Sequence, residues 1–101
     1  GTAAALDLDA VPVLSGAVEA AALGIASSLA PANRAALAGA MTVADTPRAG
    51  LLFDPQTAGG LLAAVPAEAA EGLVLALRAL GEPAAVIGHV AEGPPRLTVR
   101  G

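Results

Sequence analysis

The chain has 101 residues with no cysteine and no lysine, and nine acids against five arginines give it a net charge of −4. No basic patch is available to neutralise phosphates, which argues against nucleic acid or an anionic membrane as a partner, and the lack of cysteine excludes disulfides and thiolate metal sites. No signal peptide is visible and no apolar run reaches the roughly 18–20 residues of a membrane span, so we expect a cytoplasmic protein.

The composition is also unusually apolar for one small domain. Hydrophobic residues make up 55% of the chain and charged residues 14%, and Phe53 is the only aromatic residue. A free-standing small domain usually carries more charge on its surface. We therefore expect an exposed apolar face that another domain of the same polypeptide covers.

The first forty residues predict one strand and two helices. Residues 2–8 carry the apolar and polar alternation of a strand. Ser15 is placed to cap a helix over residues 16–23. Pro31 suits the first turn of a second helix that runs to about residue 40.

The middle of the chain predicts two strands joined by a polar loop. Residues 41–50 are expected to be connecting chain, since their Asp-Thr-Pro turn is typical of an exposed loop. Leu51-Leu52-Phe53 begins a strand that leads into the polar loop of residues 54–60. The apolar run of residues 61–65 is typical of a buried strand.

The last third of the chain predicts the clearest helix, over residues 67–80. Pro66 opens it and Gly81 follows it as a cap. Residues 84–90 and 96–99 predict two further strands. The whole pattern indicates an α+β fold, with a mixed sheet of about four to five strands and helices packed mainly on one face.

The polar loop is the most specialised stretch of the chain. Pro55 fixes its own φ and favours an extended Asp54, and the Gly59-Gly60 pair allows positive φ or the close approach of a ligand. The N–H groups from Thr57 to Gly60 could form a small nest for an anion. The alternative is a tight connection in which Asp54 and Thr57 only satisfy the backbone. Neither GxxxxGK[ST] nor GxGxxG is present, so the glycine pair is not a phosphate-binding fingerprint.

Other polar residues favour structural interpretations. Asn33 could donate to a ligand across a domain interface, but a capping role for the second helix is favoured. Ser27 and Ser28 are expected to be turn residues rather than nucleophiles. His89, the only histidine, has no evident partner and is expected to face solvent or the sheet edge.

Two acids near the start of the chain form the only candidate cation site. Asp7 and Asp9 are two residues apart, so on a strand they would share one face, a spacing that could suit a hard cation. A third ligand is not apparent, and a solvated face is the more common outcome. We therefore assign no metal-binding residue and no catalytic residue.

The stretch Asp54-Pro55-Gln56-Thr57-Ala58-Gly59-Gly60-Leu61-Leu62 resembles the Asp-Pro-Gln-Thr-Ser-Gly-Gly-Leu-Leu signature of selenophosphate synthetase, also called selenide, water dikinase. Ala58 departs from the serine that is usual in this family. Residues 11–17, 24–28 and 31–34 upstream, and residues 85–90 downstream, are similar in order to other parts of the family's C-terminal domain. The resemblance therefore extends over nearly the whole chain.

The resemblance implies a fold of the superfamily that includes aminoimidazole ribonucleotide synthetase. There the C-terminal domain packs against an N-terminal ATP-binding domain and closes one side of its cleft. It implies an enzyme that uses ATP and magnesium to convert selenide to selenophosphate, for selenoprotein and selenonucleoside synthesis, and a parent that is a homodimer. Thr57, Gly59 and Gly60 would then bind on the phosphate side of the cleft.

The resemblance also implies that the catalytic groups lie elsewhere. The family's reactive cysteine or selenocysteine, its essential lysine and its magnesium-binding aspartates belong to the N-terminal domain. We therefore expect residues 1–101 to form a single domain, most of a C-terminal domain from a longer enzyme. Alone it should be inactive and bind no cofactor stably. The alternatives are a C-terminal domain of another enzyme of the superfamily, such as thiamine-monophosphate kinase or a carboxamide-dehydrating hydrogenase maturation factor, and a non-catalytic α+β self-association module.

Overall fold

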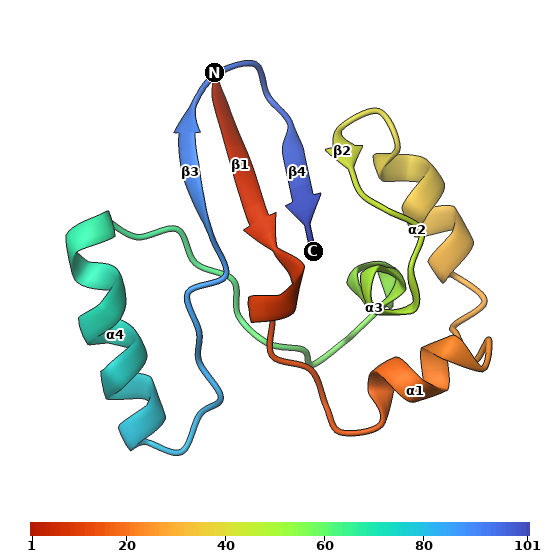
Figure 1. Ribbon diagram of the computed structural model, residues 1–101, viewed down its shortest axis with the longest axis horizontal. Coiled ribbons are helices and arrows are strands. Elements are labelled where there is room, and N and C mark those ends of the chain that lie inside the picture. The colour runs from red at the N-terminus through yellow and green to blue at the C-terminus, as the bar shows by residue number, and fades with distance from the viewer.

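A computed structural model describes residues 1–101 and contains one mixed sheet flanked by helices (Figure 1). The strands are β1 (Thr2–Asp7), β2 (Met41–Thr42), β3 (Gly88–Glu92) and β4 (Leu97–Arg100). The α-helices are α1 (Ala17–Ala22), α2 (Ala30–Leu37), α3 (Pro47–Gly50) and α4 (Ala67–Ala79), and the short 3-10 helices are η1 (Leu8–Ala10) and η2 (Leu51–Phe53). The predicted α+β class and strand number are confirmed.

The sheet places β1 next to the centre, in the order β2-β4-β1-β3. β1 runs antiparallel to β3 and parallel to β4, and β4 runs parallel to β2. At Gly88 the β3 backbone lies so close to the Ala5 carbonyl of β1 that a side chain would collide with it. Glycine is therefore required at this register position because of close backbone approach.

The short outer strand β2 is held to β4 by a side chain as well as by the ladder. Arg96 Nε donates to Thr42 Oγ1 at 2.7 Å, and its terminal nitrogens donate to the carbonyls of Gly39 and Met41 at 3.3 Å. The rigid guanidinium of Arg96 thus holds a strand of only two residues in place through its hydrogen bonds.

The helices form two groups, one beyond each edge of the sheet (Figure 1). Helices α1, α2 and α3 lie together near the β2 edge, and α4 stands apart beside the β3 edge. The prediction for α4 is confirmed almost to the residue: Pro66 precedes the helix, Glu68 lies in its first turn, Arg78 lies in its last turn, and Gly81 follows with φ +86°.

Very little of the chain is fully buried. Leu8, Ala49 and Phe53, at 3%, 0% and 3% exposure, form a small core between η1, α3 and η2. The radius of gyration is 14.4 Å, against about 13 Å for a compact domain of this length. Many large apolar side chains are exposed: Val13, Leu14, Leu23, Ile25, Leu29, Leu37, Leu61, Leu62, Val65, Leu73, Leu75, Leu80, Val86 and Val90.

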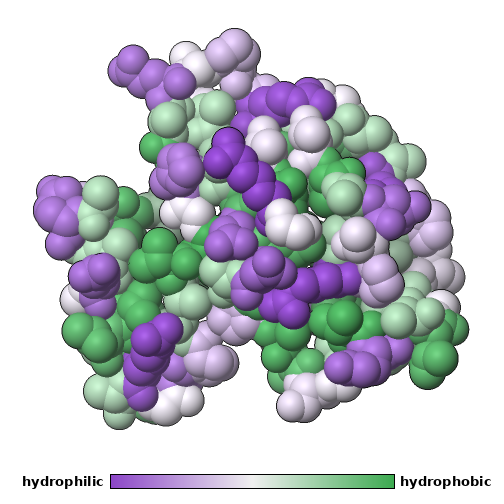
Figure 2. Space-filling view, viewed as in Figure 1, coloured by the Kyte–Doolittle hydropathy of each residue, from purple (hydrophilic) through white to green (hydrophobic).

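Hydrophobic surface gathers over α4 and on the strip between α4 and the sheet (Figure 2). Along α4, Val74 and Leu77 are half-buried, whereas Leu73 and the C-cap residue Leu80 are exposed. No helix in the structure combines the length and the apolar character that crossing a membrane requires.

Two predicted strands in the middle of the chain are wrong. Residues Leu51–Phe53 form the 3-10 helix η2, which continues directly from α3. Residues 61–65 have no regular structure, and Leu61 and Leu62 are 95% and 74% exposed. Both runs are apolar, but a short apolar run does not specify a strand, because a strand also needs a neighbour with free ladder groups.

Smaller corrections concern the ends of elements. Gly16, with φ +84°, occupies the N-cap of α1 and no side chain bonds there, so Ser15 is not the cap. The segment 41–50 contains β2 and α3, where Thr46 Oγ1 accepts a hydrogen bond from the Ala49 amide at 3.2 Å. The strand predicted over residues 84–90 lies at Gly88–Glu92.

Candidate anion-binding loop

Phe53 anchors the start of the polar loop. It is the last residue of η2 and is 3% exposed. The Arg34 guanidinium lies 4.4 Å from the centroid of its ring, and Asn33 Nδ2 donates to its carbonyl oxygen at 2.8 Å. Two consecutive residues of α2 therefore hold both the ring and the backbone of Phe53.

The loop beyond this anchor, residues 54–60, is exposed throughout. Thr57 and Ala58 form a turn, and the N–H groups of residues 57–60 make no hydrogen bond of ordinary distance and angle within the protein. Neither glycine of the pair has positive φ. Of the two uses expected for Gly59-Gly60, positive φ is wrong, and open access to the backbone is found at Gly60.

The two glycines have different surroundings. A side chain on Gly59 would begin 2.6 Å from Gln56 Oε1, because the Gln56 side chain lies over it. A side chain on Gly60 would meet nothing within 4 Å. The loop thus presents a run of free amides to solvent, and Gly60 is its most open point. Several N–H groups in sequence are the donors that an anion-binding nest uses.

Positive charge is scarce around these amides, because most arginines are engaged elsewhere. Arg48 donates to the carbonyls of Leu8 and Val11 at 3.0 and 2.9 Å. Arg78 Nε donates to the Ala84 carbonyl at 2.9 Å. With Arg34 on Phe53 and Arg96 on β2, only Arg100 has a side chain without a hydrogen bond or ion pair in the chain. The chain offers amide donors but not the cations on which phosphoryl transfer depends.

A hollow of about 500 Å³ lies between α1, α2 and α3, next to the loop entrance. Phe53 and Asp54 form one side of it, and Arg34 pairs with Asp45 at its border with 3.7 Å between nitrogen and oxygen. Asp45 is 96% exposed, so this ion pair adds little stability. The hollow shares Arg34 with the Phe53 anchor.

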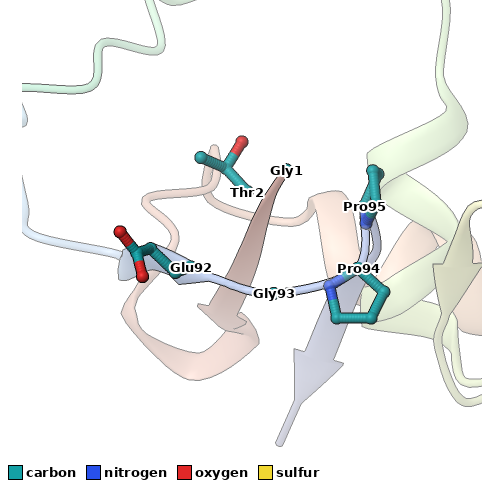
Figure 3. Close-up of a pocket in the computed structure, with 6 residues that line it drawn as sticks. All are labelled: Gly1, Thr2, Glu92, Gly93, Pro94 and Pro95. Atoms are coloured by element: carbon teal, nitrogen blue, oxygen red, sulfur yellow. The ribbon is translucent and has the colours of Figure 1, made fainter.

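A second hollow, of about 630 Å³, lies at the opposite end of β1 (Figure 3). It is lined by Gly1, Thr2, Glu92, Gly93, Pro94 and Pro95. Its only charged side chain is the Glu92 carboxylate. A hollow whose only charged side chain is a carboxylate does not suit a phosphate, and none of the predicted site residues lines it.

The other candidates have structural surroundings. Asp7 Oδ1 accepts a hydrogen bond from the Asp9 amide at 3.1 Å, so it caps η1. No group of three or more His, Cys, Asp or Glu side chains is placed to hold a metal ion, and the residues present do not fit a magnesium site. Ser27 Oγ accepts from the Leu29 amide at 3.2 Å, as expected of a turn residue. His89 is exposed on β3, as predicted.

Sequence reasoning misjudged Asn33 and missed Arg48. Asn33 is inside α2 rather than at its cap, and its partner Phe53 is 20 residues away. Arg48 stabilises the fold, because its side-chain hydrogen bonds join α3 to the segment after β1. Thr46 followed by Pro47 is a helix-start signal that could have indicated α3, although this stretch was predicted to be an exposed turn. The carbonyl partners of Arg48 have no comparable signal in the sequence.

No family model matches the chain. The chain is 36% identical over 98 residues to the selenide, water dikinase of Nitratidesulfovibrio vulgaris (strain Miyazaki F), which covers 94% of this chain and 28% of the relative. It is 33% identical over 101 residues to that of the Hildenborough strain, covering 94% of this chain and 29% of the relative. A shorter match to the selenide, water dikinase of Pelobacter propionicus is 64% identical over 45 residues, covering 44% of this chain and 13% of the relative.

The chain spans less than a third of the length of the curated relatives it matches. The two long matches include α2 and the polar loop, because they extend over 94% of the chain and these segments lie in its middle. Through nearly all of its residues the chain is therefore similar to one part of these selenide, water dikinases.

Proposed function

We propose that residues 1–101 are most of the C-terminal domain of a selenide, water dikinase, an ATP-dependent enzyme that makes selenophosphate from selenide. The observation that carries the proposal is the similarity to selenide, water dikinases over 94% of the chain. The much greater length of those relatives supports a domain within a larger enzyme. The proposal includes a cytoplasmic, homodimeric parent whose N-terminal ATP-binding domain adjoins this one.

In this proposal the chain binds ATP and closes one side of the cleft, and it supplies no catalytic group. The N–H groups from Thr57 to Gly60 donate to a phosphate of ATP, and the open backbone at Gly60 allows the phosphate to approach. Four engaged arginines and the absence of lysine support a division of labour in which the rest of the polypeptide supplies cations and magnesium. Magnesium would neutralise charge on the transferred phosphoryl group.

The test uses the full-length polypeptide that contains this chain, with ATP, Mg²⁺ and selenide, followed by phosphorus NMR. The proposal predicts selenophosphate, AMP and orthophosphate in equal amounts, and no AMP when selenide is omitted. Thiamine monophosphate serves as a second acceptor in parallel. ADP formation that depends on thiamine monophosphate, with no selenophosphate from selenide, would replace this proposal by the related kinase function.

A further inference from the structure

Asn33 occupies a helix position to which its residue type is poorly suited. It is the fourth residue of α2, in a chain rich in alanine. Asparagine is a weaker helix former than alanine, because its side chain competes for nearby backbone groups. Here the side chain does not bond within its own helix. Its amide nitrogen donates across the fold to the Phe53 carbonyl at 2.8 Å.

The neighbouring residue Arg34 contacts the other part of Phe53. Its guanidinium lies 4.4 Å from the ring centroid, within the range of a cation–π interaction, and it also pairs with Asp45 at 3.7 Å. With its ring packed and its carbonyl bonded, Phe53 is held at two points by one turn of α2. The direction in which the chain leaves Phe53 is therefore fixed by α2.

The loop that follows makes only one hydrogen bond to the rest of the chain, at its first residue. The Asp54 amide donates to the Leu51 carbonyl at 3.3 Å. No backbone or side-chain hydrogen bond to the rest of the protein involves residues 55–65. Because residues 55–60 are exposed and free of such bonds, the placement of the loop depends on Phe53 and Asp54, which come immediately before them.

We propose that Asn33 and Arg34 are positioning residues, which act through Phe53 to set the orientation of the Asp54–Gly60 loop toward ATP. This inference rests on the proposed function, in which the loop amides bind a phosphate. Neither side chain needs to touch the nucleotide. Their contribution is to keep the amides of Thr57 to Gly60 pre-oriented, so that binding does not have to order them.

The experiment compares Asn33→Leu and Asn33→Gln in the full-length polypeptide. Leucine keeps the size and branching of asparagine and removes the donor, whereas glutamine keeps an amide donor. Asn33→Leu should raise the KM for ATP roughly fivefold, the equivalent of one net hydrogen bond, with little change in Tm. Asn33→Gln should restore part of that loss.

Arg78→Ala is the matched control. It also removes a side-chain bond to a backbone carbonyl, of 2.9 Å to Ala84, but at the far end of α4. The KM for ATP should be unchanged in this variant. Arg34→Gln is the second test variant, because it removes the cation from the Phe53 ring at a residue whose side chain is 33% exposed, and it should raise the KM in the same direction as Asn33→Leu.

The outcomes separate the two proposals. A wild-type polypeptide without selenide-dependent ATP consumption would refute the proposed function itself. An active wild type with unchanged KM for ATP in both Asn33→Leu and Arg34→Gln would overturn the positioning role and leave the function standing. Variants that lower Tm and the amount of active enzyme, while KM stays at the wild-type value, would equally show that α2 serves only stability.

Discussion

Gly60 is the residue at which binding and folding can be separated most cleanly. The added side chain would meet no atom within 4 Å, and the residue has no positive φ, so the isolated chain contains no structural reason for glycine there. In the proposed function the reason is the ligand, since a phosphate must approach the backbone closely.

Gly60→Val should therefore leave the free energy of unfolding within about 0.5 kcal/mol of the wild type, as is usual for open surface positions. In the full-length polypeptide it should raise the KM for ATP or lower kcat/KM. Gly39→Val is the control, because Gly39 is equally open and lies outside the loop. A Gly60→Val enzyme with normal folding and normal ATP kinetics would contradict a phosphate contact at this residue.

Arg48 is the residue with the largest structural role that the sequence did not reveal. Its guanidinium bonds the carbonyls of Leu8 and Val11, about forty residues earlier in the chain. The same is true of Asn33 and its partner Phe53. Local patterns can predict that a residue caps a helix or lies on a surface, but not which distant carbonyl it will meet.

Arg48→Ala should lower the free energy of unfolding by about 2–3 kcal/mol, because charge-assisted hydrogen bonds to two carbonyls are lost. Urea denaturation followed by circular dichroism measures the change. Arg100→Ala, which removes a side chain without such bonds, should change the stability by less than about 0.5 kcal/mol. Equal effects of the two substitutions would show that the Arg48 bonds contribute nothing net.

At the scale of elements, the sequence predicted those helices and strands that have clear end signals or an alternating pattern. Helix α4 was predicted because Pro66 and Gly81 mark its two ends. Strands β1 and β4 were predicted from their patterns. The runs 51–53 and 61–65 were misassigned, since a short apolar run fits a strand or a helical turn equally well. The polar loop between them was predicted as a loop, and its role as a binding site is still a prediction.

Two glycines in regular elements should respond to alanine with opposite signs. Gly88→Ala should destabilise the chain by about 1–3 kcal/mol, because its Cβ would press against the Ala5 carbonyl and separate β3 from β1. Gly72→Ala lies inside α4 with no neighbour within 4 Å, and should stabilise it by about 0.5–1 kcal/mol. Denaturation midpoints measure both, and a tolerated Gly88→Ala would contradict the β1–β3 register.

At the scale of the whole molecule, the chain carries more apolar surface than its small core explains. Only three residues are buried, while many leucines and valines are exposed, including Leu61 and Leu62 directly after the polar loop. Monomeric proteins seldom expose contiguous apolar patches beyond a few hundred Å². Exposed apolar side chains are what the composition led us to expect, and a domain that covers them is still a prediction.

The isolated chain should accordingly bind a hydrophobic dye and self-associate in sedimentation experiments. Replacing Leu61 and Leu62 together by aspartate should reduce dye binding without lowering the denaturation midpoint, because both side chains are already in solvent. Val18→Asp, at a half-buried position in α1, is the destabilising control. A wild-type chain that is a monodisperse monomer and binds no dye would contradict the covered face.

The proposed function makes this chain a necessary but non-catalytic part of a selenide, water dikinase. Selenophosphate formation from ATP and selenide tests it in three preparations: the full-length polypeptide, the polypeptide without residues 1–101, and the 101-residue chain alone. Only the full-length polypeptide should make selenophosphate above a no-protein control. Turnover by the isolated chain, or undiminished turnover by the polypeptide that lacks it, would contradict the claim.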